Sequence, residues 1–451
     1  MSNNYSEFDK NSRFITSKVD IYFDGINNSP TTFNTDMIVD WDINEGLSNI
    51  NNHPIGSMIS NELNLNILNQ DGLLDPNNEN SIYHKKIKRK LPIKVYIKED
   101  ETPDWILVGT YYVDDWIISS SNMSVNIIAY DLLYDILNKP IPVIPMEVNN
   151  KLSNMLYDIF KKLGCSDDKI IIDVDLNDIV LDYSFGLEGI TSSTLNELCN
   201  TYLFYITVDR LENIRCTSLN SILKLKPIEL SGNKQVYTLN AGTSILKEYN
   251  GVKVTYKTYK TSDSDVVVDI KDKEYNVGET ILRDIKFNKT LINRINGITT
   301  VSEHNSNAVI LNFDPYNINI QVNNSHTSKQ NITLMVQASS LEVEYESDVR
   351  LLNENNDNDT GTIFEVNGSY ITSNEIASNI CKVLLNYLTS NNTNFDIELK
   401  GNPIIKPGAV ISVKDIPKTG EQTGIVYNVT MKYDGSFSMM VKCINKGVIS
   451  Q

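Results

Sequence analysis

The sequence has little of what a metal site, a redox site or a disulfide framework requires. Its five cysteines lie far apart between Cys165 and Cys443, and its four histidines occur singly, without C-x-x-C, H-x-x-H or H-E-x-x-H spacing. Those spacings are typical of zinc sites and thiol redox motifs. Cys199 and Cys381 fall on the apolar sides of predicted helices, where cysteine usually packs as a small hydrophobic residue. We therefore predict no metal site, no cofactor and no disulfide framework.

Basic residues are also in short supply. The chain of 451 residues contains 57 Asp and Glu against 40 Lys and Arg, which gives a formal net charge of −17. Proteins that bind nucleic acid by neutralising phosphates need a basic face, so we expect no specific nucleic-acid binding. No apolar run approaches the roughly 20 residues of a membrane span, and the first residues lack the apolar core of a secretory signal. The composition thus predicts a soluble protein made in the cytoplasm, with no membrane span.

Catalytic motifs are missing as well. No phosphate-binding glycine loop and no G-x-S-x-G nucleophile motif occurs. Asp114 and Asp115 form a carboxylate pair of the type that glycosidases use, but adjacent acids arise by chance in so acidic a chain. Residues 356–367 resemble a calcium-binding EF-hand loop, yet Asn367 stands where a bidentate Glu belongs. We predict no catalytic residue, and we expect the protein not to be an enzyme.

One basic cluster stands out, at residues 84–90, which read His-Lys-Lys-Ile-Lys-Arg-Lys. Such a run is compatible with contact to nucleic acid or another anionic surface. The alternative is a solvated connector, which we favour because Ile87 and Leu91 anchor the run in a fold.

Most of the chain has the two-residue alternation of half-exposed β-strands. The length predicts two to four domains, since single cores rarely exceed about 250–300 residues. Apolar and polar residues alternate in five clear segments, which points to antiparallel sheets with one solvated face. The apolar positions are Leu63/Leu65/Ile67, Ile93/Val95/Ile97, Val252/Val254/Tyr256, Ile318/Ile320/Val322 and Leu341/Val343/Tyr345.

Three segments have helical periodicity. The first carries apolar residues from Leu152 to Leu163 and ends at Gly164. The second and third begin with capping-box patterns, at 194–197 and 372–375, and carry apolar stripes that extend to Tyr202 and Leu388. We expect these stripes to pack on sheets.

The two ends of the strand-rich region match in spacing. Pro92 and Gly109 are 17 residues apart, as are Pro407 and Gly424, and each glycine precedes a tyrosine by 3 residues. The next matched apolar residue follows 13 residues later in both segments, 92–127 and 407–442. The spacing indicates an internal duplication, with chance similarity of strand–turn–strand units as the alternative.

Several segments resemble the tail hub proteins, or tail-tip proteins, of phages and phage-tail-like bacteriocins of Gram-positive hosts. The clearest is the turn Asn-Gln-Asp-Gly-Leu-Leu-Asp-Pro-Asn at 69–77, followed by the hairpin Val-Gly-Thr-Tyr-Tyr-Val at 108–113. The helix–strand segment 193–210 and the Gly-Asn-Pro-Ile-Ile-Lys-Pro-Gly segment at 401–408 also match the family. Together the matches are spread over most of the chain.

The resemblance implies a mainly β fold with α+β parts: two tube-like antiparallel β-barrels, a small α/β domain and an inserted β-rich domain. We expect the first barrel at 15–140 and the α/β domain at 141–230. The second barrel is expected at 231–258 and 390–447, interrupted by a β-rich insertion with one helix at 259–389. In this family three protomers present six barrels to a hexameric tail tube, which is what the matched segments would provide.

The function implied is a homotrimeric structural hub that adapts the tail tube to the threefold tail tip and organises the baseplate. Its expected partners are further copies of itself, the tail tube protein, the tape measure protein, other baseplate proteins and a spike or hydrolase. Its expected location is the virion tail or baseplate particle, assembled in the host cytoplasm. The basic cluster at 84–90 could then pair with acidic groups of a neighbouring tail protein. A receptor- or carbohydrate-binding tail protein is the alternative, and a cell-wall hydrolase is disfavoured.

Overall fold

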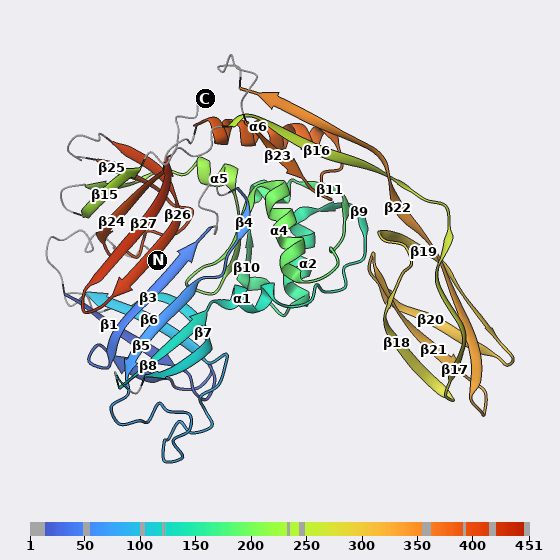
Figure 1. Cartoon of the computed structure of the whole chain (residues 1–451), viewed down its shortest axis with the longest axis horizontal. Helices are drawn as coiled ribbons and strands as arrows, with labels where there is room; N and C mark the ends of the chain where they lie inside the picture. Colours follow the sequence, from blue (N-terminus) through green and yellow to red (C-terminus); the bar gives the residue numbers. More distant parts are fainter. Residues whose placement is uncertain are drawn as a thin grey trace.

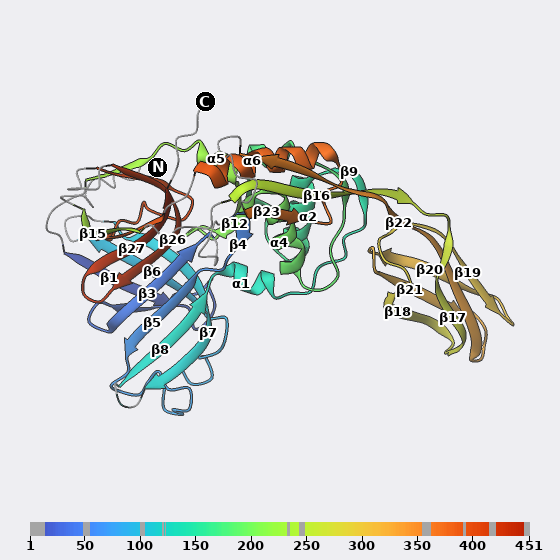
Figure 2. The same cartoon turned by 45° about the horizontal axis from the view of Figure 1, so that its top comes forward.

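The computed structural model describes residues 14–47, 55–99, 104–119, 121, 123–231, 235–242, 249–353, 362–390, 394–414 and 421–445. A large curved sheet lies at one end of the molecule, a compact α/β unit adjoins it, and a long arm that contains β16 (Tyr249–Thr261) and β22 (Gln330–Leu352) extends away to a small β domain (Figures 1 and 2). The predicted fold class, mainly β with an α/β unit and a β-rich insertion, is confirmed.

The large sheet contains 13 strands drawn from both ends of the chain. Its N-terminal strands are β1 (Ile15–Ile21), β2 (Thr31–Asn34), β3 (Ile38–Gly46), β5 (Glu62–Leu68), β6 (Pro92–Glu99), β7 (Ile106–Ser119) and β8 (Ser124–Tyr130). Its C-terminal strands are β14 (Ile228–Ser231), β15 (Val236–Gly242), β24 (Asn394–Lys400), β25 (Val410–Lys414), β26 (Gln422–Tyr433) and β27 (Phe437–Asn445). The two sets are joined where β3 pairs with β26, so the two predicted barrels form one continuous sheet over a shared core.

The two sets of strands have the same topology. We call β1, β3 and β5–β8 the first half-sheet, and β14, β15 and β24–β27 the second half-sheet. Their strands run in the orders β3-β5-β8-β7-β6-β1 and β15-β24-β27-β26-β25-β14, which are identical when the strands of each half are numbered along the chain. One direction differs, because β1 is antiparallel to β6 whereas β14 is parallel to β25. The order supports the duplication that the spacing indicated.

The register of the two half-sheets also agrees, down to their irregularities. Leu63 pairs with Ala129 in the first half-sheet, and Phe395 pairs with Cys443 at the same place in the second. Bulges follow Ile38 in β3 and Val236 in β15. Further bulges follow Val113 in β7 and Val426 in β26, so these two valines correspond.

This register corrects the correspondence taken from sequence spacing. If Val113 corresponds to Val426, then Gly424 corresponds to Tyr111 and not to Gly109. The matched segments were located correctly, but their alignment was wrong by two residues. Glycine is needed at both places for separate reasons: a Cβ at Gly109 would meet the ring of Tyr111, and one at Gly424 would meet the ring of Phe395.

The α/β unit packs helices on a small mixed sheet. Its strands are β4 (Ser57–Met58), β9 (Glu147–Lys151), β10 (Ile170–Ile172), β11 (Val180–Ser184), β12 (Phe204–Val208) and β13 (Ile214–Ser218). Its helices are α1 (Leu132–Leu137), α2 (Leu152–Lys162), α3 (Val174–Asn177), α4 (Thr191–Tyr202) and α5 (Leu219–Leu223). The order β10-β13-β12-β4 includes a strand from the connection between β3 and β5. α2 confirms the first predicted helix, and Gly164 follows it with φ +96°.

The two predicted capping boxes are wrong in detail. α4 begins at Thr191, so Thr194 lies inside the helix, where its Oγ1 accepts a hydrogen bond from the backbone N–H of Leu187. α6 (Asn374–Ser390) is capped by Ser373, whose Oγ accepts from the N–H of Ile376 at 3.3 Å. Thr372 instead donates to Asp182. In both segments tertiary partners occupy the side chains that a local cap would use.

The insertion forms the arm and its tip. The arm consists of β16 (Tyr249–Thr261), β22 (Gln330–Leu352), β23 (Thr362–Asn367) and α6, and the tip of β17 (Asp265–Tyr275), β18 (Gly278–Lys286), β19 (Ile292–Ser302), β20 (Ser306–Phe313) and β21 (Asn317–Asn324). β16 pairs with β22 and β23, although the expected range 231–258 assigned its first residues to the second barrel. Val343 and Tyr345 are exposed, so the alternation predicted at 341–345 does not face a core.

Candidate assembly surfaces

Arg210, at the end of β12, joins three parts of the molecule. Its Nε and Nη2 donate to the two carboxylate oxygens of Glu45 on β3, at 3.2 and 3.1 Å. Its Nη1 donates to the carbonyl of Pro403, and its Nη2 lies 3.5 Å from the sulfur of Met431 on β26. Glu45 is buried and Arg210 is mostly so. A bidentate, largely desolvated pair thus connects the α/β unit to both half-sheets.

A second polar cluster lies beside this joint. The carboxylate of Asp131 accepts hydrogen bonds from the backbone N–H of Asn61 and of Leu133, and from the Ser60 hydroxyl, at 2.9–3.0 Å. Burial nevertheless raises the pKa of Asp131 to about 7, because loss of water outweighs these donors. The Asn61 amide donates to the carbonyl of Val208 at 3.2 Å. These bonds hold the first half-sheet against β12.

One face of the large sheet is polar across both half-sheets. Asn126 donates to Asn64 and Asn66, and Asn66 donates to Asp40 at 2.6 Å. Across the joint between the half-sheets, Asn428 donates to Asn44 at 2.9 Å. The opposite face of the same strands forms the shared core, with Trp41 and Leu65 fully buried. The asparagines therefore form hydrogen-bonded ladders across β8, β5 and β3 and across the joint to β26.

The basic cluster at 84–90 is largely neutralised within the chain. Lys86 forms an ion pair with Asp24 at 2.9 Å, Lys90 with Asp135 at 2.6 Å, and Arg89 with Asp114. Among the described residues, no ion pair involves Lys85 or Lys88. The interpretation of this cluster as a connector thus accounts for most of its charges. The cluster lies beside β7, where Lys90 and Arg89 contact Val113 and Asp114.

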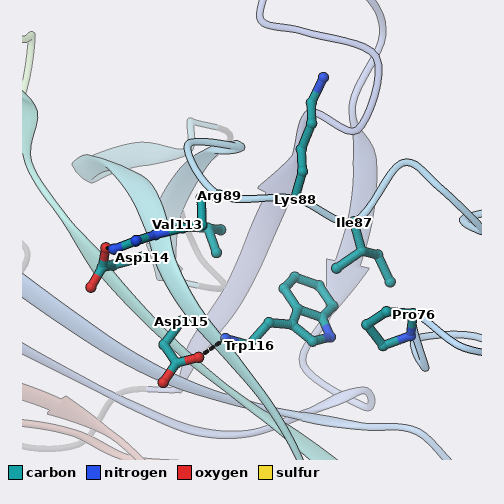
Figure 3. A pocket seen from close by; sticks show the side chains of 8 residues that line it. All are labelled: Pro76, Ile87, Lys88, Arg89, Val113, Asp114, Asp115 and Trp116. Carbon is teal, nitrogen blue, oxygen red and sulfur yellow. Dashed lines mark hydrogen bonds and ion pairs between the residues drawn. The ribbon is translucent and has the colours of Figure 1, made fainter.

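An open depression separates this connector from β7. Figure 3 shows its lining, in which Arg89 reaches Asp114 while Asp115 turns back to the backbone N–H of Trp116 at 2.8 Å. The indole Nε1 of Trp116 donates to the carbonyl of Leu74 at 3.0 Å. Asp114 and Asp115 therefore have separate partners and point apart, which does not favour a paired acid and base. The lining residues are Pro76, Ile87, Lys88, Arg89, Val113, Asp114, Asp115 and Trp116.

Other candidate residues are scattered. Of the EF-hand-like loop, 356–361 lie outside the described residues, and 362–367 form β23. The fold stacks His304 on His326 with ring centroids 3.9 Å apart, a proximity that their sequence spacing does not reveal. All five cysteines are free thiols, and four are buried. Within the described part of the chain, no group of three or more His, Cys, Asp or Glu side chains could hold a metal ion. None of the helices described has both the length and the apolar character needed to cross a membrane.

Two solved structures are similar to this architecture over nearly their whole length. The chain is similar to the 43 kDa tail protein of prophage MuSo2 from Shewanella oneidensis, with a TM-score of 0.53 and 11% identity, covering 96% of this chain and 98% of that one. It is also similar to the tail protein from Neisseria meningitidis MC58, with a TM-score of 0.51, 9% identity and 96% coverage of each chain. This chain has the fold of a phage tail protein. No family model and no curated protein matches the sequence.

The phage tail fold covers the half-sheets, the α/β unit and the insertion together, since the similarity extends over nearly the whole length of both neighbours. The predicted resemblance to tail proteins is thereby confirmed at the level of the fold. At these identities the similarity concerns architecture alone. Sequence reasoning located the segments at 193–210 and 401–408, and the structure brings them together, because Arg210 of one binds the carbonyl of Pro403 in the other.

Proposed function

We propose that this protein is the structural hub of a phage or phage-tail-like baseplate, and that it acts as a homotrimer without catalysing a reaction. The observation that carries the proposal is the duplicated half-sheet within a chain of phage tail fold. Three chains with two equivalent half-sheets each would present six similar units, which is the number that a hexameric tube ring requires. Closed rings of identical contacts are the common way in which protein subunits assemble.

The proposed division of labour follows the architecture. The half-sheets, for which the sequence predicted the ranges 15–140, 231–258 and 390–447, would contact the tail tube protein and surround the tape measure protein; we now assign β14 to the second half-sheet and β16 to the arm. The α/β unit and the arm would contact other baseplate proteins and a spike or hydrolase. The particle would be assembled in the host cytoplasm and carried in the virion tail.

The polar face of the large sheet supports a channel-lining role. Along β3, β24, β26 and β27 it carries Asp40, Asp42, Asp396 and Glu398 against Lys400, Lys432 and Lys442. A hydrogen-bonded asparagine and acid surface would not attract a passing polyanion, because it offers few phosphate partners. We therefore propose that this face lines the channel of the ring.

The experiment is to locate and count the protein in tails purified from cells that express its gene cluster. Gold labelling of an affinity-tagged chain is expected at the distal tip, and quantitative mass spectrometry is expected to find three copies for every six tube subunits of one ring. Deletion of the gene is expected to abolish tail assembly. Labelling along the tail fibres, or tails that assemble normally without the protein, would refute the hub role.

A further inference from the structure

The joint between the two half-sheets is a template for a second contact. β3 pairs antiparallel with the distal half of β26, with Thr430 opposite Asn44, Met431 opposite Ile43 and Lys432 opposite Asp42. The proximal half of β26 pairs with β25 on the same side. On this side, the first residues of β26 thus pair with β25 of the same half-sheet, and its last residues pair with β3 of the first half-sheet.

β7, the counterpart of β26, has the same construction but lacks the second covering strand. Its proximal half pairs with β6 as far as Tyr112, and the backbone of Val113 still bonds to Lys90 and Leu91. From Asp115 to Ser119, β7 pairs only with β8 among the described residues. Its outer edge there is open.

One apolar side chain on this open edge is exposed although its counterpart is buried. By the register of the bulges, Ile118 corresponds to Met431, and Ile118 is 37% exposed whereas Met431 is fully buried. Ile117 is 46% exposed. The depression of Figure 3 runs along Val113, Asp114, Asp115 and Trp116, the counterparts of the β26 residues next to the end of β3. The depression therefore lies along β7 just before the open edge, with the connector residues Pro76, Ile87, Lys88 and Arg89 forming its other side.

The counterpart of β3 is β15, and its outer edge is open too. β15 pairs with β24 alone among the described residues, and it is the terminal strand of the large sheet. Leu239 corresponds to Trp41, because Leu239 lies three residues after Val236 and Trp41 lies three residues after Ile38, the residues that precede the two bulges. Trp41 is fully buried under the joint, whereas Leu239 is only half-buried. Among the described residues, the first half-sheet thus has an uncovered edge on β7 and the second half-sheet has one on β15. These two strands correspond to β26 and β3, which form the joint within the chain.

We propose that β15 of one copy pairs antiparallel with the distal half of β7 of a second copy, in the register of the internal joint. The register places Ile117 opposite Gly242, Ile118 opposite Ala241 and Ser119 opposite Asn240. The inference rests on the proposed function, whose ring it would close. The occupant is a second copy of this chain because, among the described strands, β15 shares the bulge position and pairing register of β3 and has an edge that no strand covers.

The two open edges belong to different strands, β15 at the end of the sheet and β7 within it, so the contact is head-to-tail. Such contacts continue from copy to copy until the rotation closes a ring. In the isolated chain, the carboxylate of Asp115 accepts from the N–H of Trp116. This bond occupies a backbone donor at the edge and limits indiscriminate strand pairing until the second copy arrives.

Disulfide trapping tests the register. In the internal joint, the backbone N–H of Leu47 donates to the carbonyl of Tyr427, so these two residues form a hydrogen-bonded pair. The two pair types alternate along an antiparallel ladder, so Asp42 and Lys432 form a non-hydrogen-bonded pair, whose side chains are closer together. Their counterparts are Asn240 and Ser119, and side chains in such pairs are near enough for a disulfide. The variant Ser119→Cys/Asn240→Cys is oxidised at high concentration, and the products are separated by non-reducing electrophoresis.

We expect the double variant to give covalent closed rings, and an equimolar mixture of the two single variants to give covalent dimers only. The matched control Asp42→Cys/Lys432→Cys is expected to give an intrachain disulfide in every copy. The off-register control Ser119→Cys/Thr238→Cys is expected to give at least about tenfold less product, which corresponds to roughly 1.4 kcal/mol. In parallel, Ile118→Lys should weaken self-association about tenfold or more, while Val309→Lys at the exposed tip should not change it.

Association without the Ser119–Asn240 disulfide would overturn the proposed seam and leave the hub function standing. A chain that remains monomeric and uncrosslinked at the highest soluble concentration would also overturn it, whereas loss of the hub function would appear separately, as absence of the protein from the tail tip. A disulfide formed within single copies of the double variant, detected by the lack of dimers in the mixture, would equally refute a contact between copies.

Discussion

Corresponding strands of the two half-sheets have different neighbours. β3 is flanked by β5 and β26, and its Trp41 is fully buried, with its indole donating to Ser17 at 2.9 Å. β15 has only β24 beside it among the described residues, and the corresponding Leu239 is half-buried. The two strands share topology and bulge, yet one carries a large aromatic anchor and the other a smaller side chain. The difference shows that the neighbour across the edge, more than the strand's own fold, decides what a position must bury.

The largest effect is expected from breaking the joint between the half-sheets. Arg210→Ala leaves Glu45 buried without its cation, so we expect a loss of about 3–5 kcal/mol in the free energy of unfolding. Denaturant titration measures it. The control is Arg215→Ala, whose pair with Asp209 is more exposed and is worth no more than about 1 kcal/mol. Equal losses for the two variants would mean that Arg210 is not a joint.

Trp41→Ala and Leu239→Ala compare the two edges directly. Trp41 is fully buried, and we expect its replacement to cost about 3–5 kcal/mol, whereas half-buried Leu239 should cost about 1–2 kcal/mol in the single protomer. Denaturation below and above the association concentration provides the measurement. If β15 joins a second copy, the cost of Leu239→Ala rises on association and that of Trp41→Ala does not. A constant cost for both would show that the β15 edge stays open.

Glycine substitutions compare a close approach in each half-sheet, at two positions that do not correspond in the corrected register. In Gly424→Ala the new Cβ would lie 2.6 Å from the Phe395 ring and 2.7 Å from the carbonyl oxygen of Ile444. Backbone cannot yield easily, so we expect a loss of about 1–3 kcal/mol. In Gly109→Ala the close atoms belong to the Tyr111 side chain, and the loss should be smaller. The opposite ranking in thermal unfolding would mean that the Tyr111 ring is held more rigidly than the second half-sheet's backbone.

Asp131 introduces a pH dependence that has no equivalent at the same position of the second half-sheet, where Asn445 stands. The folded pKa of Asp131 is raised to about 7, whereas an unfolded Asp ionises near pH ~3.9. Between these values the folded state binds the extra proton, so stability is highest below pH ~4 and decreases as pH rises to about 7. Asp131→Asn should flatten this part of the Tm profile. An unchanged slope in the variant would assign the pH dependence to other groups.

The smallest effect concerns the long connection between β5 and β6, which has only a short counterpart, 401–409, in the second half-sheet. The ion pair of Lys86 with Asp24 is solvent-exposed on both sides, so Lys86→Ala should cost about 0–1 kcal/mol. Lys85→Ala/Lys88→Ala, which breaks no described pair, serves as the control. A change in the salt dependence of assembly with either variant would indicate that the cluster contacts a neighbouring protein after all.

Local patterns were sufficient for the strands and for one helix terminus. Leu63, Leu65 and Ile67 alternate with asparagines and are fully buried, because side-chain period two leaves one face for the core. Gly164 ends α2 in the left-handed region, where glycine has no Cβ penalty. The first capping box failed because α4 begins at Thr191, and the second because Thr372 bonds to the distant Asp182. The exposed Val343 and Tyr345 show that alternation alone does not identify a core face.

The joint at Arg210 and the edges of β7 and β15 had no local signal. An arginine after a strand and a glutamate 165 positions earlier carry no mark of their contact until the α/β unit is seated against both half-sheets. The duplication was visible as spacing, but its register was set by bulges, and a bulge is a property of two paired strands and not of one sequence.

The sequence by itself determined that the chain is mainly β and resembles tail proteins, because strand alternation and turn motifs are local properties. Only the tertiary structure decided which residues of the two half-sheets correspond, that both share one sheet, and that two strand edges remain open. Those facts depend on pairing between segments up to several hundred residues apart, where register follows from the fit of whole strands and their partners.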